Sequence, residues 1–184
     1  MSRDQLVHDW VASRFPGQTV DIEPASADAS FRRYFRLTLP DGSTRILMDA
    51  PPDKENCRPF VAIAKLLADA QLNAPRVLAE DHEQGFLLLS DLGNDLYINA
   101  LQQDDKRDHA LFLDAIDALI AWQRSSKPDV LPPYDAALLQ RELDLFPEWF
   151  VGKHLQYTLS EADRGVLDKT FALGFGTGAQ FAED

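Results

Sequence analysis

The sequence predicts an α+β protein in which a small antiparallel sheet is followed by a set of helices. Segments that favour strands lie in the first half of the chain, and the second half has only helical spacing of apolar residues. The turn signal Pro40-Asp41-Gly42 separates residues 31–39 from 44–48, which predicts a β-hairpin because proline presets φ and glycine tolerates a positive φ. We therefore expect a strand-rich region at 1–92 and a helical region at 93–184.

The first region is expected to begin with an amphipathic helix over residues 3–15. Ser2 followed by Gln5 resembles a capping box, which marks a helix start. Residues 19–23 then alternate apolar and polar side chains as a first strand, and Pro24 interrupts that pattern.

A second helix and two short strands are expected after the hairpin. The helix lies between Pro51-Pro52 and Asn73-Ala74-Pro75, which break helical structure. The strands are expected at 76–79 and 86–89. The second of them is fully apolar, which is typical of a strand buried on both faces.

The second region reads as helical until its end. Helices are expected over 95–102, 107–124 and 136–154, and from Ser160 onward. Pro147 is expected either to kink the third of these helices or to start a new helical segment. From about residue 174 the sequence loses its periodicity, so we expect an irregular tail.

Composition and charge narrow the possible partners. The net charge of −12 argues against nucleic acid, whose phosphates require a basic surface. It does not argue against a nucleotide, because one phosphate site needs only local donors. Cys57 is the only cysteine, and no apolar run reaches the roughly 18 residues of a membrane span. We expect a cytoplasmic protein that binds neither nucleic acid nor membrane.

The order of several phrases resembles a known family. The phrases are Ser30–Tyr34, Met48–Pro52, Cys57–Phe60, Ala74–Leu78 and Gly85–Gly93. In this order they resemble the aminoglycoside phosphotransferase and choline kinase group, in the branch of anomeric kinases of N-acetylmuramate and N-acetylglucosamine. The resemblance covers residues 1 to about 172.

This resemblance implies a protein-kinase-like fold and a sugar kinase activity. Residues 1–92 would be the nucleotide-facing amino-terminal lobe, and residues 93–184 the first helices of a helical carboxy-terminal lobe. The implied reaction is phosphorylation of the anomeric hydroxyl of an amino sugar in cell-wall recycling, with ATP and Mg²⁺ as cofactors. The implied partners are a nucleotide and a small sugar.

Two segments would contact the nucleotide if the resemblance holds. The loop before the first hairpin strand would lie over the phosphates, and the connector after the apolar strand would hydrogen-bond adenine. The matching residues are Ser26, Ala27, Asp28, Ala29, Ser30 and Phe31 in the loop and Leu89, Ser90, Asp91 and Leu92 in the connector. Without the resemblance, the first segment reads as a plain polar turn and the strand before the connector as core.

The cations of a kinase site depart from the usual pattern. Kinases carry a lysine on the third strand that pairs with the phosphates and a helix glutamate. Met48 stands at the lysine position here, and the glutamate position falls near Phe60. Arg32, Arg33 or Lys54 would then have to hold the phosphates. We favour Arg33, because it shares a strand face with apolar residues of the expected core.

No catalytic or metal-binding residue can be assigned. The family uses a His-x-Asp-x-x-x-x-Asn run and a later Ile-Asp pair, but no histidine here precedes an aspartate by two positions. Ile116-Asp117 lies in an amphipathic helix with Asp117 on its polar face. We therefore expect the chain to stop before the catalytic loop and to be inactive alone.

Two other interpretations stay open. The chain could be a non-catalytic module that binds a nucleotide or a partner. It could also be a truncated relic whose exposed helix faces favour self-association.

Overall fold

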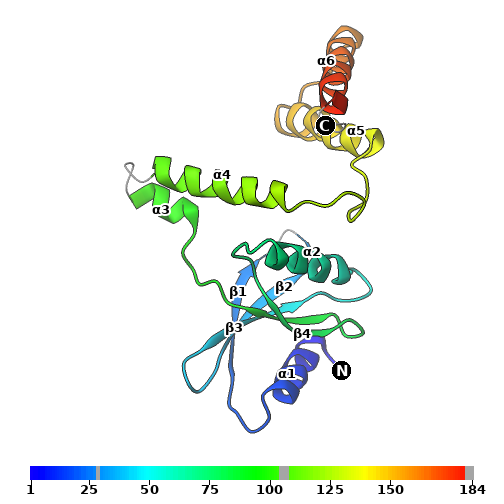
Figure 1. The fold of residues 1–184 in the computed structure, drawn as a ribbon. Helices are drawn as coiled ribbons and strands as arrows, with labels where there is room; N and C mark the ends of the chain where they lie inside the picture. Colours follow the sequence, from blue (N-terminus) through cyan, green and yellow to red (C-terminus); the bar gives the residue numbers. More distant parts are fainter. Residues whose placement is uncertain (28–29, 104–107, 181–184) are drawn as a thin grey trace. The chain divides into compact units, whose positions relative to one another are not determined.

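The computed structural model describes residues 1–27, 30–103 and 108–180 (Figure 1). The chain divides into two compact units, Met1–Ser126 and Lys127–Asp184. That residues 1–92 form a nucleotide-facing lobe remains a prediction. Among the described helices, none is long and apolar enough to cross a membrane.

The first unit confirms the predicted α+β class. Its elements are α1 (Arg3–Arg14), β1 (Asp21–Ala27), β2 (Arg33–Thr38), β3 (Thr44–Asp49), α2 (Arg58–Asp69), β4 (Val77–Asp81), β5 (Phe86–Ser90), α3 (Tyr97–Gln103) and α4 (Asp108–Arg124). The predicted hairpin is β2 and β3. Ser2 caps α1 as the sequence indicated, because its hydroxyl accepts from the Gln5 N–H at 3.2 Å, but the Gln5 side chain donates to Asp9 and does not complete a capping box.

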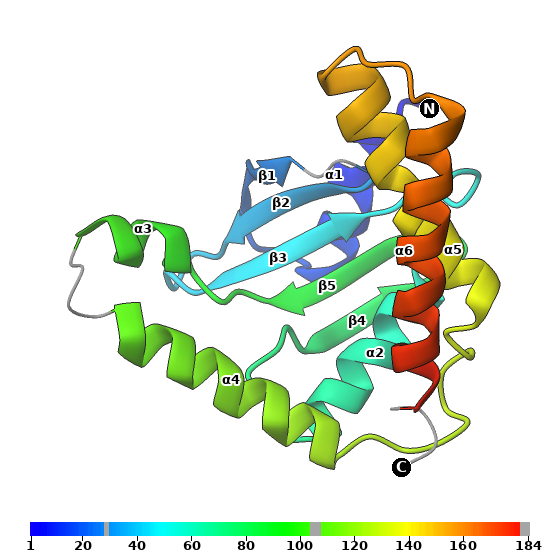
Figure 2. The same cartoon turned by 90° about the horizontal axis from the view of Figure 1, so that it is seen from above.

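The five strands form one antiparallel sheet in the order β1-β2-β3-β5-β4 (Figure 2). Helices α1 and α2 cover its opposite faces (Figure 1). Strand β5 lies inside the sheet, with Phe86 and Leu88 packed on the α1 side and Leu87 and Leu89 on the α2 side. The prediction that this strand is buried on both faces is therefore confirmed.

Strand β1 extends further than the sequence indicated. We expected Pro24 to interrupt it, but pairing with β2 continues to Ala27 across a register shift between Pro24 and Ser26. Proline is tolerated here because β1 is an edge strand, and a bulge absorbs the missing donor. Ser26 and Ala27, expected in a loop, thus belong to β1.

The second unit is helical, as predicted. It contains α5 (Ala136–Leu145), the π-helix η1 (Phe146–His154) and α6 (Glu161–Gln180). Of the two alternatives for Pro147, the new helical segment is the one observed, because Pro147 lies in the first turn of η1, where it needs no N–H partner.

The prediction of an irregular tail from about residue 174 was wrong for residues 174–180, which continue α6. A helix that has begun gains one hydrogen bond per added residue, so glycine weakens it without ending it. Residues 181–184 lie outside the described part of the chain.

Gly85, in the β4–β5 turn, is hydrogen-bonded to the residue that follows β3. Its carbonyl accepts from the Ala50 N–H at 2.8 Å, and its φ is +72°. A Cβ at this position would lie 1.9 Å from the Ala50 carbonyl oxygen, so the two segments would have to separate.

We predict that Gly85→Ala lowers the free energy of unfolding by about 1–3 kcal/mol more than Gly17→Ala does. Both glycines have a positive φ and share the backbone strain, but a Cβ at Gly17 would meet nothing within 4 Å. Urea unfolding of the two variants measures the difference. Equal losses would show that the Ala50 contact does not constrain the turn.

Candidate functional site

A cavity of about 420 Å³ opens beside the end of β5, within the first unit. Residues from β1, β2, β3 and α2 form its walls together with the connector that follows β5. They include Ala25, Tyr34, Arg36, Ile46, Phe60, Pro75, Leu89, Ser90, Asp91, Leu92, Gly93, Asn94 and Leu96. Its size is within the range of small-molecule sites, and apolar side chains dominate its lining.

The structure brings the four predicted connector residues to this cavity. Leu89 is buried in the α2-side core, and Ser90 and Asp91 follow at the cavity wall. Ser90 fixes the neighbouring chain, because its N–H donates to the Arg76 carbonyl and its hydroxyl accepts from the Arg76 N–H, both at 2.9 Å. The exposed Leu92 completes this part of the rim.

Arg36 on β2 holds Asp91 in place. Its Nε and Nη2 donate to the two carboxylate oxygens at 2.7 and 3.2 Å. The Gly93 N–H adds a third bond, at 2.8 Å. The Arg36 hydrogen bond is the main reason that the pKa of Asp91 falls from 3.8 to about 2, and burial opposes it. The connector is thus fixed to the sheet by a charged pair.

The predicted phosphate loop is only partly described. Ser26 and Ala27 end β1, while Asp28 and Ala29 lie outside the described residues. The exposed Ser30 accepts from the Arg32 N–H at 3.2 Å through its hydroxyl.

Phe31 and Arg32 connect this loop to the segment before α2. Glu55 accepts from the Phe31 N–H at 3.2 Å and from Arg32 Nε at 3.3 Å. Lys54 Nζ lies 4.8 Å from the centre of the Phe31 ring. Two of the three candidate phosphate cations, Arg32 and Lys54, are therefore close to the loop.

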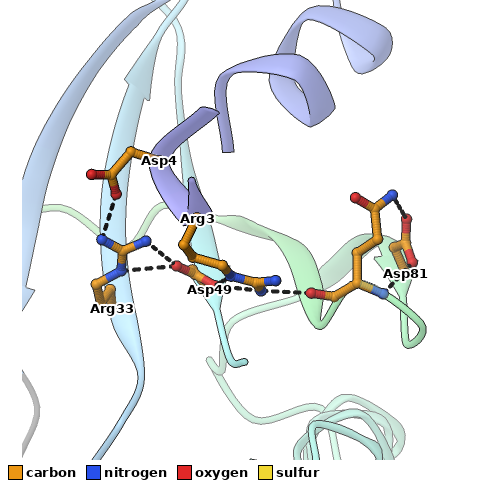
Figure 3. A network of polar contacts seen from close by, with 6 residues as sticks. Arg3, Asp4, Arg33, Asp49 and Asp81 are labelled. Atoms are coloured by element: carbon orange, nitrogen blue, oxygen red, sulfur yellow. Dashed lines mark hydrogen bonds and ion pairs between the residues drawn. The ribbon is translucent and has the colours of Figure 1, made fainter. Parts of the chain in front are cut away.

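The third candidate, Arg33, is committed elsewhere. Its Nε and Nη2 donate to Asp49 Oδ2 at 2.8 and 2.6 Å, and its Nη1 donates to Asp4 on α1 at 2.7 Å (Figure 3). We favoured Arg33 because it shares a face with the core. That face is the one covered by α1, so Arg33 points away from the cavity beside α2.

Asp49 is the one fully buried charged residue that the described chain contains. Arg3 of α1 donates to its other oxygen from Nε and Nη2 at 2.8 and 2.6 Å, so two guanidinium groups hold one carboxylate (Figure 3). Such forked, charge-assisted bonds satisfy a buried carboxylate. The only sequence signal of Asp49 is its place directly after the apolar residues 46–48, which does not by itself indicate a buried charge.

The same helix also holds the β4–β5 turn. Arg3 Nη2 donates to the Gln84 carbonyl at 2.5 Å, and Trp10 Nε1 donates to Asp81 at 3.1 Å. Asp81 in turn accepts from the Gln84 N–H at 2.9 Å. Helix α1 therefore connects the end of β3 to the turn that precedes the connector strand.

The two positions that the resemblance assigns to the usual lysine–glutamate pair lie in an apolar cluster. Met48 is fully buried, and Phe60 of α2 packs against the same cluster. Met48 and Phe60 thus lie side by side, and neither carries a charge.

The described residues offer no evident site for magnesium. No group of three or more His, Cys, Asp or Glu side chains among them is arranged to hold a metal ion. Ile116 and Asp117 are both exposed on α4, so their side chains lie on its surface.

The five-stranded antiparallel sheet with a cavity at its connector is consistent with the amino-terminal lobe of a kinase-like phosphotransferase. The sequence profile of the phosphotransferase enzyme family matches residues 21–173, so the chain belongs to that family.

Within this family the chain is similar to N-acetylmuramate/N-acetylglucosamine kinases. It is 53% identical over 164 residues to the one from Pseudomonas aeruginosa, covering 84% of this chain and 48% of that protein. It is 50% identical over 152 residues to the one from Pseudomonas putida, covering 83% and 44%. It is 41% identical over 172 residues to the one from Neisseria meningitidis, covering 92% and 51%. The chain thus spans about half the length of these relatives.

We predict that Asp49→Ala lowers the free energy of unfolding by about 3 kcal/mol, because it leaves two arginines around a buried position. The matched control is Asp69→Ala, which removes the exposed pair with Lys65 and costs less than about 1 kcal/mol. Urea unfolding measures both. A loss below 1 kcal/mol for Asp49→Ala would contradict the role of this carboxylate.

We predict that Asp91→Asn loses about 2 kcal/mol of stability near pH 7. Because the folded pKa of Asp91 is depressed to about 2, its contribution is complete above pH 3.8 and is lost as the pH falls toward 2. The difference in unfolding free energy between the natural chain and the variant should therefore shrink over that interval. A difference that is constant from pH 6 to pH 2 would refute the ion pair as its source.

Proposed function

We propose that this chain provides the nucleotide-binding lobe of an ATP-dependent amino-sugar kinase. The single observation that carries the proposal is the cavity at the connector, which is bounded by Leu89, Ser90, Asp91 and Leu92. Family membership supports the phosphotransferase class, and the similarity to N-acetylmuramate/N-acetylglucosamine kinases supports an amino sugar as the acceptor.

In this proposal the cavity holds the adenine and the connector backbone faces it. Tyr34, Ile46 and Phe60 supply apolar walls from three separate elements. Arg36 and Asp91 hold the connector in one conformation before the ligand arrives, which lowers the ordering cost of binding.

The phosphates would extend toward residues 26–31. Backbone N–H groups of a turn can bind phosphate oxygens. We assign the supporting positive charge to Lys54 or Arg32 and not to Arg33, because Arg33 lies on the α1-covered face of the sheet, where two carboxylates, Asp49 and Asp4, hold its guanidinium group.

The reaction would transfer the γ-phosphoryl group of ATP to the anomeric hydroxyl of the sugar. ADP leaves with the bond to the γ-phosphorus broken, and a base must take the hydroxyl proton. Magnesium would neutralise phosphate charge, but we assign it no ligand among the described residues. The contribution of this chain is to orient the nucleotide.

A second candidate function is a binding module without turnover. The apolar cluster of Met48 and Phe60 favours such a module, because it contains no charged side chain that could stabilise the transferred phosphoryl group. Release of ADP in the presence of N-acetylglucosamine or N-acetylmuramate would contradict the module, whereas binding without release of ADP is expected of the module and also of a lobe that only orients the nucleotide.

We predict that saturating Mg-ATP raises the melting temperature of this chain, since a ligand at a hundred times its Kd stabilises by about 2.7 kcal/mol. Ala25→Trp should remove the shift, because it places an indole in the cavity. Ala12→Trp, on the exposed surface of α1, is the matched control and should keep it. An unchanged shift in Ala25→Trp would place the nucleotide elsewhere, and no shift in the natural chain would refute nucleotide binding.

A further inference from the structure

Strand β4 forms one edge of the sheet (Figure 2). It pairs with β5 on one side, and no other strand of the described chain pairs with it on the other. The free edge of a sheet is where a further strand adds most readily, because its backbone donors and acceptors have no ladder partner. The opposite edge, β1, is interrupted by Pro24, which cannot donate to a ladder. Strand β4 contains no proline, so it is the edge suited to accept another strand.

Three exposed residues at alternate positions mark this edge. Arg76 directly precedes β4, Leu78 lies inside it, and Glu80 is the last residue but one. Leu78 is 46% exposed, and 48% of the Glu80 side chain is exposed. All three line a second cavity, of about 400 Å³, between β4 and α2. They therefore border the side of the strand that faces α2.

The two charges of this set are separated along the strand and are open to a partner. The Arg76 guanidinium group has no hydrogen-bond or ion-pair partner among the described residues. Glu80 Oε2 lies 3.2 Å from His82 Nε2, and the other carboxylate oxygen has no partner within the same part of the chain. A cation thus lies at the start of β4 and a carboxylate near its end.

This pattern is complementary to itself in the antiparallel orientation. When two copies of β4 run antiparallel across Leu78, Arg76 of each copy faces Glu80 of the other, and the two Leu78 side chains meet at the two-fold axis. In the parallel orientation like charges would face each other, which is unfavourable. Charge therefore favours a second copy of this chain as the occupant of the edge.

The bulge of β4 also fits a symmetric pairing. The register with β5 shifts between Val77 and Ala79, which leaves Leu78 as the extra residue. A bulge at an edge hinders the addition of a regular strand. Across a two-fold axis at Leu78 the two bulges lie opposite each other, so neither of them faces a regular strand.

We propose that two copies of this chain associate through β4 and form one continuous antiparallel sheet across a two-fold axis at Leu78. The net charge of −12 on each copy opposes association at long range, but salt at physiological concentration screens charges more than about 8 Å apart. The contact is small, so the dimer should dissociate on dilution. The proposal does not depend on nucleotide binding.

The test measures the mass of this chain by sedimentation equilibrium over a range of concentrations at physiological ionic strength. The mass should rise with concentration from 20.7 kDa toward twice that value. Arg76→Glu and Glu80→Arg each place like charges at both contacts, so each should raise the dissociation constant at least about tenfold. The double variant exchanges the two charges and should restore the dissociation constant to within about threefold. Arg124→Glu makes the same charge change at the exposed end of α4 and, as the matched control, should leave it unchanged.

Hydrogen exchange places the contact on the strand. The amides of residues 77–80 should exchange more slowly at the highest concentration than at the lowest, because pairing protects the free edge. The amides of β1 should exchange at the same rate at both concentrations.

Three results would overturn the proposal. The chain could remain a monomer at every concentration. It could form a dimer that Arg76→Glu and Glu80→Arg do not weaken, which would place the contact on another surface, such as the exposed helix faces. The double variant could also dissociate as readily as the single variants, which would exclude the antiparallel pairing. No nucleotide is present in the assay, so its failure is distinct from a failure of ATP binding.

Discussion

The burial of one carboxylate constrains most of the first unit. Asp49 lies at the end of β3 without solvent contact, and two arginines from different elements satisfy it. A buried charge without partners is strongly unfavourable, so α1, β2 and β3 must meet with their side chains correctly placed. Arg3 also donates to the Gln84 carbonyl in the turn before β5. It therefore connects the buried carboxylate to the strand that leads into the cavity.

The cavity depends on a second charged pair at the other end of the sheet. Arg36 and Asp91 fix the connector where β5 leaves the core. The hydrogen bond from Arg36 strongly favours the charged form of Asp91. The two pairs use two arginines of β2, Arg33 at its first residue and Arg36 three residues further on. A short strand thus positions both the helix that stabilises the lobe and the segment proposed to bind adenine.

Local patterns in the sequence predicted the elements well and their partners poorly. The turn Pro40-Asp41-Gly42 gave the hairpin, and apolar spacing gave the helices, because both signals act over a few residues. The connector was identified by resemblance and lies at the cavity. The pairing of Asp49 with Arg3, 46 positions away, depends on tertiary packing and could not be read from spacing. The pairing of Arg33 with Asp49 and Asp4 depends on tertiary packing in the same way, since Arg33 shares a strand face with the core and α1 covers that face.

Helix α1 has a consequence for where the folded lobe begins. The family match starts at residue 21, so the helix at Arg3–Arg14 lies outside it, although its Arg3 satisfies a carboxylate of the matched sheet. A version of the protein trimmed to the matched residues would keep every strand. It would also lose Val7, Trp10 and Val11 from the core and leave Asp49 with one arginine. The folded unit therefore begins earlier than residue 21, where the match to the family profile starts.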